Sequence, residues 1–268
     1  MMRGETIAAS LHFSSDEDHD NDHENSLHLR RFASPLHGAC FWCVGDPLPS
    51  GDAVVARMLA HNAQRQTQLA GYHGMRRYVL ENERVHKHAE MLVRVECGAD
   101  ETKHFEVVSE EGWKAAHKHV LQKMLDSEAE ASSPEIRTRT RLSPENYEFH
   151  MVRAALLGDR MAYAIDIVPK RHEDRLFEGR IWIDAQDYAL VRAEGKPATN
   201  LSFWIRSVHF VHTYEKSGPF WFPASTESDT EVRIFGSTSL TIHYFGYTPN
   251  PLQTPETASA ATLGAITQ

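Results

Sequence analysis

The fold is decided by the stretch MAYAIDIVP, residues 161–169. Every second residue from Met161 to Ile167 carries a large apolar side chain, and alanine or aspartate stands between them. Successive side chains of a β-strand point to opposite faces, so this period of two predicts a strand with one strongly apolar face. Pro169 cannot donate a ladder hydrogen bond and is expected to end the strand.

Similar patterns lie on both sides of that stretch and fill the chain from about Tyr147 to Tyr247. Short turns separate them at Gly158-Asp159, at 185–187 and at Gly218-Pro219. Because no helical pattern intervenes, parallel pairing is excluded and an antiparallel meander is expected, curved into an unclosed barrel. The expected strands are 147–156, 161–167, 177–184, 188–194, 203–214, 220–223, 226–235 and 240–247.

Two more strands and two helices are predicted upstream. Alternation is clear over 89–97 and again over 103–109. Helical spacing of apolar residues indicates amphipathic helices over 52–70, with Gly71 as terminator, and over 113–129. The threonine-arginine alternation of 137–141 suggests a loop or an edge strand. The fold class is therefore mainly β, with two or three helices plugging the concave side of one large sheet.

Composition limits the function. The 268 residues are 41% hydrophobic and 24% charged, which is typical of a globular protein large enough to fold without disulfides. The formal net charge is −9, and the sequence contains no basic stripe, so nucleic-acid binding is disfavoured. No stretch approaches the roughly 20 apolar residues of a membrane-spanning helix.

The two ends of the chain are expected to be disordered tails, 1–50 and 250–268, around a single domain of residues 51–249. An acidic, histidine-containing run occupies 16–24 and has nothing to bury. The first residues lack the apolar core of a secretory signal. Cys40 and Cys43 have redox or metal spacing, but a closed zinc site requires four ligands.

Candidate catalytic groups are sparse. His86 and His88 share one side of an extended chain, whereas His117 and His119 diverge on a helix, and solvated surface histidines are the simpler interpretation of both pairs. Asp184 flanks a turn with Asp187, where carboxylates usually accept backbone N–H groups, and an ion pair between Asp184 and Arg180 is expected. We predict no catalytic or metal-binding residues.

Apolar strand faces remain the notable feature, because several strands, such as 203–214, are apolar on both faces. Such faces form a packed core covered by the helices, or they hold an apolar ligand. The candidate ligand-binding residues are those of the alternating faces and of the second helix: Met91, Val93, Val95, Phe105, Val107, Trp113, Val120, Met124, Met161, Tyr163, Ile165, Ile167, Ile181 and Ile183.

Several segments resemble the family of LolA- and LolB-like carriers, and in particular the outer membrane lipoprotein-sorting proteins. The resemblance covers residues 52–247 and is most specific between Pro169 and Gly236. The segments are IVPKR (167–171), LFEGRIWID (176–184), DYALVR (187–192), EGKPA (194–198), SFWIR (202–206), GPFWFP (218–223) and EVRIFG (231–236).

This resemblance implies an open barrel whose apolar interior carries the acyl chains of lipoproteins, or another lipid, without chemistry and without a cofactor. It also implies a periplasmic location, with an inner-membrane transporter or an outer-membrane receptor as partner, and a monomer is expected. Two alternatives stay open: a regulatory sensor of the same fold that binds lipoprotein or lipopolysaccharide, and a metal-dependent hydrolase.

Overall fold

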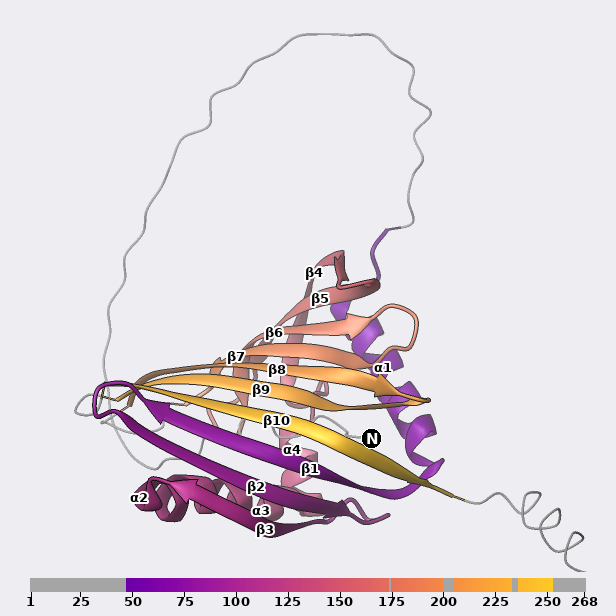
Figure 1. Ribbon diagram of the computed structural model, residues 1–268. Coiled ribbons are helices and arrows are strands. Elements are labelled where there is room, and N and C mark those ends of the chain that lie inside the picture. The colour runs from indigo at the N-terminus through magenta and orange to yellow at the C-terminus, as the bar shows by residue number, and fades with distance from the viewer. Residues whose placement is uncertain (1–46, 174, 200–204, 233–235, 253–268) are drawn as a thin grey trace, which may run out of the picture.

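A computed structural model describes residues 47–173, 175–199, 205–232 and 236–252. Within these ranges the strands form a single ten-stranded sheet in the order β3-β2-β1-β10-β9-β8-β7-β6-β5-β4. Each neighbouring pair is antiparallel, and the terminal strands β3 and β4 do not pair with each other, so the curved sheet stays unclosed (Figure 1). The structure confirms the predicted fold class.

The strands follow the sequence pattern closely, and most are longer than predicted. Their bounds are β1 Leu69–Asn82, β2 Lys87–Cys97, β3 Lys103–Gly112, β4 Tyr147–Leu157, β5 Arg160–Pro169, β6 Phe177–Asp184, β7 Leu190–Pro197, β8 Ile205–Ser217, β9 Phe220–Val232 and β10 Gly236–Pro251. Since β10 ends at Pro251, the first two residues of the expected C-terminal tail belong to the sheet. The N-terminal run of 16–24 and Cys40 and Cys43 lie outside the described residues.

The two parts of the meander are joined by strands that are far apart in sequence. β1 pairs with β10 over nearly its whole length, from Leu69 opposite Pro251 to Asn82 opposite Thr238. This pairing places the hairpins β1-β2-β3 beside the seven-stranded run β4 to β10. One continuous face therefore extends from β3 to β4.

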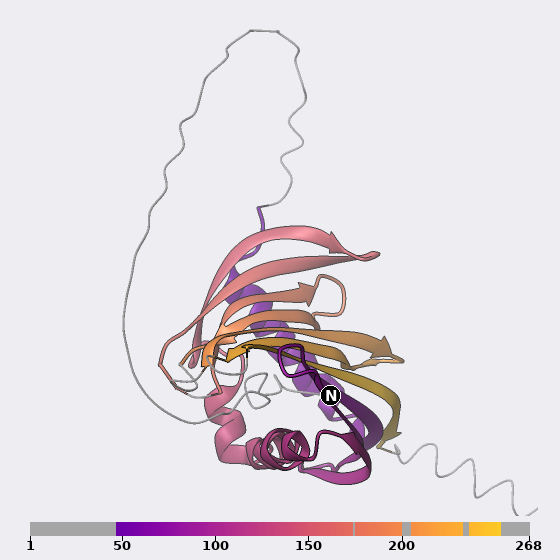
Figure 2. The same cartoon turned by 60° about the vertical axis from the view of Figure 1, so that its left-hand side comes forward.

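Helices cover the concave side of the sheet at two places (Figures 1 and 2). Helix α1, Gly51–Gln66, begins at Ser50, whose hydroxyl accepts from the Ala53 amide at 3.2 Å. A second helical segment consists of α2 Lys114–Ala116, the π-helix η2 His117–Leu121 and α3 Gln122–Ala131. A short helix α4, Pro134–Thr140, follows.

Two local predictions were wrong. The first helix ends at Gln66, and Gly71 lies inside β1, where its backbone approaches the Cys97 carbonyl too closely for any Cβ. Residues 137–140 are not a loop or edge strand: Pro134 starts α4 from the first helical turn, where its missing N–H costs nothing. In the second helical segment, Leu121 of the π-helix is fully buried and Val120 is partly buried.

Candidate functional site

One row of side chains crosses the concave face through nine of the ten strands, from β2 to β4. Directly opposed residues in an antiparallel pair share a face, so the registers of successive pairs can be followed across nine strands. The row begins in β2, ends in β4 and is polar only at its centre. It consists of Met91, Tyr78, Ile242, Thr226, His212, Ala193, Ile181, Ile165 and Met151.

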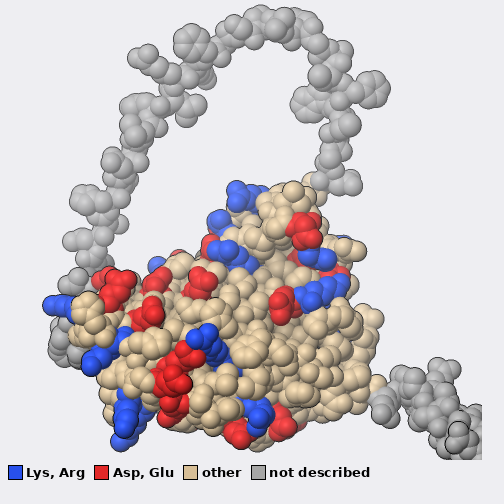
Figure 3. Space-filling model, viewed as in Figure 1, with Lys and Arg blue, Asp and Glu red and all other residues tan. Residues whose placement is uncertain are grey.

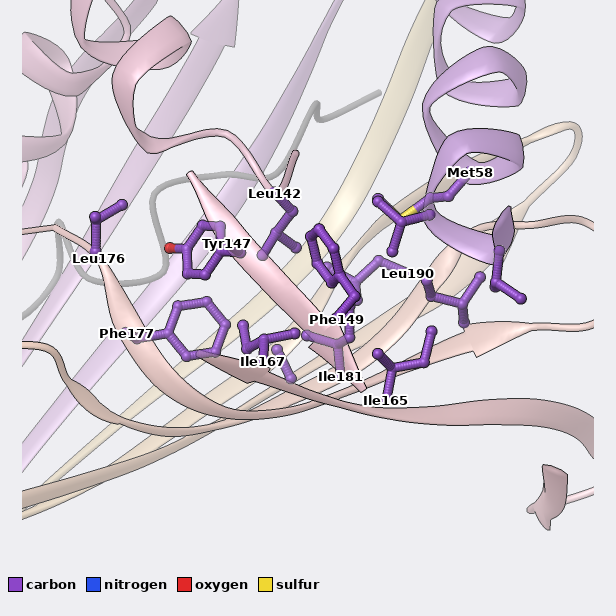
Figure 4. Close-up of a cluster of buried hydrophobic side chains, with 14 of the residues drawn as sticks. Met58, Leu142, Tyr147, Phe149, Ile165, Ile167, Leu176, Phe177, Ile181 and Leu190 are labelled. Carbon is purple, nitrogen blue, oxygen red and sulfur yellow. The ribbon is translucent and has the colours of Figure 1, made fainter. Parts of the chain in front are cut away.

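The first apolar cluster lies where α1 packs against β4 to β8 (Figure 4). Val54, Val55 and Met58 of α1 are buried against Ile165 and Ile181, none of them more than 1% exposed. Gly51 brings the start of the helix so close that an added Cβ would lie 2.7 Å from the Phe149 carbonyl oxygen. The other buried members are Leu142, Tyr147, Phe149, Ile167, Leu176, Phe177, Ile183, Leu190, Ala193 and Phe210.

The second apolar cluster lies where η2 and α3 pack against β1, β2 and β10. Ala116, Leu121, Met124 and Leu125 of the helical segment are buried against the sheet. The sheet contributes Tyr78, Leu80, Ala89, Met91, Val93, Val95, Leu240, Ile242 and Tyr244, with Phe105, Trp113, Val120 and Tyr247 partly buried at the margin. Both predicted helices therefore cover the same face of the sheet, as expected.

A buried charge cluster occupies the concave face beside the second apolar cluster. The Arg76 guanidinium of β1 donates to the Glu128 carboxylate of α3 at 2.6 Å, and the Lys103 ammonium of β3 donates to the same carboxylate at 2.9 Å. Burial alone would raise the pKa of Glu128, but the charges and hydrogen bonds of Arg76 and Lys103 outweigh burial and hold this pKa well below its usual value. The guanidinium also lies 4.9 Å from the ring centroid of Tyr244.

His212 and Thr226 form a polar centre between the two apolar clusters. The His212 ring bonds through Nδ1 to the Thr226 hydroxyl, which is 3.0 Å from the Tyr244 hydroxyl. Burial lowers the pKa of His212 to about 3, with the positive charges of Arg76 and Lys103 acting in the same direction and that of Glu128 opposing. The adjacent Ser228 hydroxyl is buried and has no hydrogen-bond partner among the residues that the structure describes. Along the row from Met91 to Met151 the concave face is thus apolar at both ends and polar in the middle.

Sequence reasoning missed this polar centre, although the sequence contains a signal for it. Arg76 occupies a concave position between Gly74 and Tyr78, so its concave neighbours along the strand are glycine and an aromatic residue. His212 likewise stands between Phe210 and Tyr214. A cationic or imidazole side chain in an otherwise apolar alternating set indicates a buried polar contact.

The predicted ligand-binding residues all lie on the concave face or on the helical segment that covers it. They divide between the two clusters and do not converge on one spot. Twelve are buried or partly buried, whereas Met161 is 47% and Val107 37% exposed. Met161 is the second residue of β5, and Val107 lies in the edge strand β3 beside a bulge.

The predicted ion pair between Asp184 and Arg180 is wrong. Asp184 pairs with Arg160, at 2.5 and 2.9 Å, and Arg180 pairs with Asp166 instead. The reason is the register: Arg180 stands opposite Asp166 on the convex face.

Of the four histidines expected at the surface, one is not there. His117 is buried and donates from Nε2 to the Glu111 carbonyl at 2.8 Å, whereas His86, His88 and His119 are exposed as expected.

The predicted turn contact of Asp184 is confirmed. Its carboxylate accepts from the amides of Gln186 at 2.9 Å and Asp187 at 2.6 Å. Burial acts to raise the pKa of Asp184, but the hydrogen bonds from Arg160 and from these two amides outweigh burial and lower it. Asp184 therefore fixes the β6-β7 turn.

The surface visible in Figure 3 carries acidic and basic side chains in scattered groups, without a broad basic area. Ion pairs at the surface of the sheet include Arg77–Glu90 and Arg180–Asp166. In the part of the chain that the structure describes, no three His, Cys, Asp or Glu side chains are arranged to hold a metal ion. The described helices include none that is long and apolar enough to cross a membrane.

Comparison with known proteins gives one family match. The model of a family of unknown function, DUF5686, matches residues 133–250, which is less than half of the chain. The match begins at α4 and includes β4 to β9 and nearly all of β10, the region of the first apolar cluster. None of the curated proteins compared with the chain matches it.

Solved structures with a similar arrangement include a LolA superfamily protein from Nitrosomonas europaea, with 7% identity and a TM-score of 0.41 over 78% of this chain and 97% of that one. A domain from Vibrio parahaemolyticus described as outer membrane lipoprotein-sorting has 8% identity and a TM-score of 0.40, covering 80% and 97%. A DUF1329 family protein from Desulfovibrio piger has 10% identity and a TM-score of 0.41, also covering 80% and 97%.

Proposed function

We propose that this protein binds and carries the acyl chains of lipoproteins, or of another lipid, on its concave face, without chemistry. The observation that supports this most is the row from Met91 to Met151, because it places two apolar clusters on one face, each covered by its own helical segment. A single packed core would not require two clusters with separate helical covers. Separate helical covers can move apart and expose the sheet between them.

Apolar burial would provide the binding energy. Each methylene transferred from water contributes about 0.8 kcal/mol, so a chain of a dozen methylenes can offset the cost of displacing a helix. The polar centre at His212 and Thr226 would set the depth that an acyl chain reaches, since buried polar groups disfavour apolar neighbours that leave them unpaired. Carriage needs no catalytic group, in agreement with the absence of a predicted one.

The periplasm is the location that we propose, with a membrane transporter or receptor as the partner that loads or unloads the chain. This part of the proposal rests on the sequence resemblance between Pro169 and Gly236. It predicts that the purified protein exchanges its ligand with such a partner and does not hydrolyse it.

A direct test compares two glutamate variants on opposite faces of β5. Met161→Glu places a charge on the exposed end of the concave face, whereas Val168→Glu places one on the convex face at similar exposure, 47% against 40%. Both sites are open to solvent, so both variants should fold. We expect Met161→Glu to weaken binding of a fluorescent fatty acid several-fold and Val168→Glu to leave it unchanged.

Native mass spectrometry of the purified and the delipidated protein completes the test. A retained acyl ligand that delipidation removes supports carriage. If the protein retains no acyl ligand and does not bind the fluorescent fatty acid, the proposed function is wrong. Equal losses in Met161→Glu and Val168→Glu would place the binding site away from the concave face.

A further inference from the structure

One group of side chains lies where the concave face meets solvent beside α1. Arg57 of α1 donates from Nη1 to the Tyr188 hydroxyl at 2.7 Å, and its guanidinium carbon is 5.4 Å from the centroid of that ring. Tyr163 of β5 stacks on Tyr188 with centroids 6.4 Å apart, and His61 lies 5.2 Å away on the helix side. We call Arg57, His61, Tyr163 and Tyr188 the mouth cluster.

The backbone at Tyr188 is strained in a way that holds this ring in place. Tyr188 has φ +48°, a conformation that side-chain-bearing residues rarely adopt. Arg65, two turns along α1 from Arg57, donates to the carbonyls of Asp187 at 2.8 Å and Tyr188 at 3.3 Å. The Asp184 carboxylate holds the other side of the turn. These contacts aim the Tyr188 ring at Arg57.

Arg57 differs from the other arginines around this turn. Arg160 and Arg180 each hold a carboxylate, whereas Arg57 is exposed and forms no ion pair within the described part of the chain. The nearby Asp187 carboxylate does not compensate Arg57, because it is taken up by Arg160 at 3.0 Å and by Lys216 at 2.7 Å. Most of the guanidinium donors of Arg57 are therefore available to a ligand.

Apolar surface adjoins these donors on both sides. Tyr163 and Tyr188 pack against the first apolar cluster. On the solvent side, Leu156 and Met161 stand directly opposite each other on β4 and β5, and they are 68% and 47% exposed. The surface thus offers cationic and phenolic donors at the edge of an apolar face, which is the pattern of an amphiphile with an acceptor-rich head.

We infer that the mouth cluster binds the anionic head, a phosphate or a carboxylate, of the amphiphile whose chain lies on the concave face. Arg57 matches such an oxyanion because a guanidinium donates two parallel hydrogen bonds to a carboxylate or phosphate. The Tyr188 hydroxyl accepts from Arg57 and forms a second side-chain hydrogen bond with Tyr163, so the two phenols hold the guanidinium at the edge of the apolar face. This inference rests on the proposed function and specifies its ligand class.

The experiment uses ligands that share one sixteen-carbon chain: hexadecyl phosphate and palmitate as anions, and 1-monopalmitoylglycerol as the neutral reference, all below their aggregation concentrations. Inorganic phosphate alone is the fourth ligand. Calorimetric titrations compare the unmodified chain with Arg57→Gln and Tyr188→Phe. Arg153→Gln, which removes an exposed arginine from β4, is the matched control.

We expect the unmodified protein and Arg153→Gln to prefer the two anions over the monoglyceride by about tenfold or more, the size expected for one or two charge-assisted hydrogen bonds. Arg57→Gln should abolish the preference, and Tyr188→Phe should reduce it, while monoglyceride binding stays unchanged in both.

Three results would contradict the inference. Equal binding of anionic and neutral ligands, or a preference that survives in Arg57→Gln, overturns it and leaves the proposed function intact, since the monoglyceride still binds. If inorganic phosphate binds as tightly as hexadecyl phosphate, the mouth cluster is a site for a free anion and not for the head of an amphiphile. If none of the three sixteen-carbon ligands binds, the proposed function fails and this inference fails with it.

Discussion

The Arg76 guanidinium on β1 lies 2.6 Å from the Glu128 carboxylate on α3, and only 1% of the Arg76 side chain is exposed. This contact connects the sheet to the second helical segment within the buried charge cluster. Glu128→Gln removes the negative charge and leaves two buried cations without it, so we expect a loss of about 3 kcal/mol in the free energy of unfolding at pH 7. Urea denaturation measures this loss.

Glu106→Gln is the control for that variant. Glu106 pairs with Arg94 on the sheet surface, where both side chains are more than half exposed. Solvent weakens such pairs, and this variant should unfold at nearly the same urea concentration as the unmodified protein. Equal midpoints for Glu128→Gln and the unmodified protein would contradict a structural role for the buried contact.

Acid should weaken the same contact. The pKa of Glu128 is lower in the folded chain than its ordinary value of 4.5, so the unfolded chain takes up the proton first. The stabilisation is complete above about pH 4.5 and is lost as the pH falls toward the lower folded-state pKa, at up to about 1.4 kcal/mol per pH unit. Urea unfolding at pH 5, 4 and 3 should show this slope in the unmodified protein and a shallower one in Glu128→Gln.

His212 should contribute a second pH dependence, at higher pH. Burial lowers its pKa from 6.5 to about 3, so the unfolded chain again binds the proton first. The contribution of the neutral His212 ring to the free energy of unfolding is fully present above about pH 6.5. It declines as the pH falls from there toward 3, by up to about 1.4 kcal/mol per pH unit. Replacement by Gln should remove this part of the slope between pH 6 and 5. An NMR titration in which the His212 ring protonates near its ordinary pKa would contradict the prediction.

The β6-β7 turn should depend on Asp184. Its side chain is 1% exposed and satisfies Arg160 and two backbone amides, so Asp184→Ala is expected to destabilise the fold by about 2–4 kcal/mol. Asp166→Ala, which breaks the more exposed pair with Arg180, should cost at most about 1 kcal/mol. Thermal unfolding of both variants separates the two cases, and similar costs would show that the turn tolerates the loss of its carboxylate.

Ile181 lies at the centre of the first apolar cluster, between Ile165 and Ala193, and is fully buried. Ile181→Asp should therefore unfold the protein, because a buried carboxylate without a partner costs more than about 4 kcal/mol. Ile181→Val should cost about 1 kcal/mol. Circular dichroism beside a fatty-acid binding assay provides the readout. A folded Ile181→Asp variant that has lost binding would show that this side chain lines an open cavity.

Local pattern determined much of this structure. The period of two from Met161 to Ile167 is a property of neighbouring residues, and it placed β5 and the face that β5 buries. The same reasoning located most of the other strands and the two helical covers, because amphipathic periodicity follows from backbone geometry alone, but it missed β1, Leu69–Asn82. Even the carboxylate that holds the turn at Asp184 could be predicted, since the two backbone amides that donate to it lie within three residues.

The tertiary structure decided everything that depends on which strands meet. The β1-β10 pairing joins residues about 170 positions apart and puts Met91 and Ile165 on one face, a relationship that no local period encodes. The partner of Asp184 is Arg160 because the β5-β6 register brings them together. The contacts of Arg76 with Glu128 and of Arg57 with Tyr188 likewise exist only because long-range packing brings a helix over the sheet.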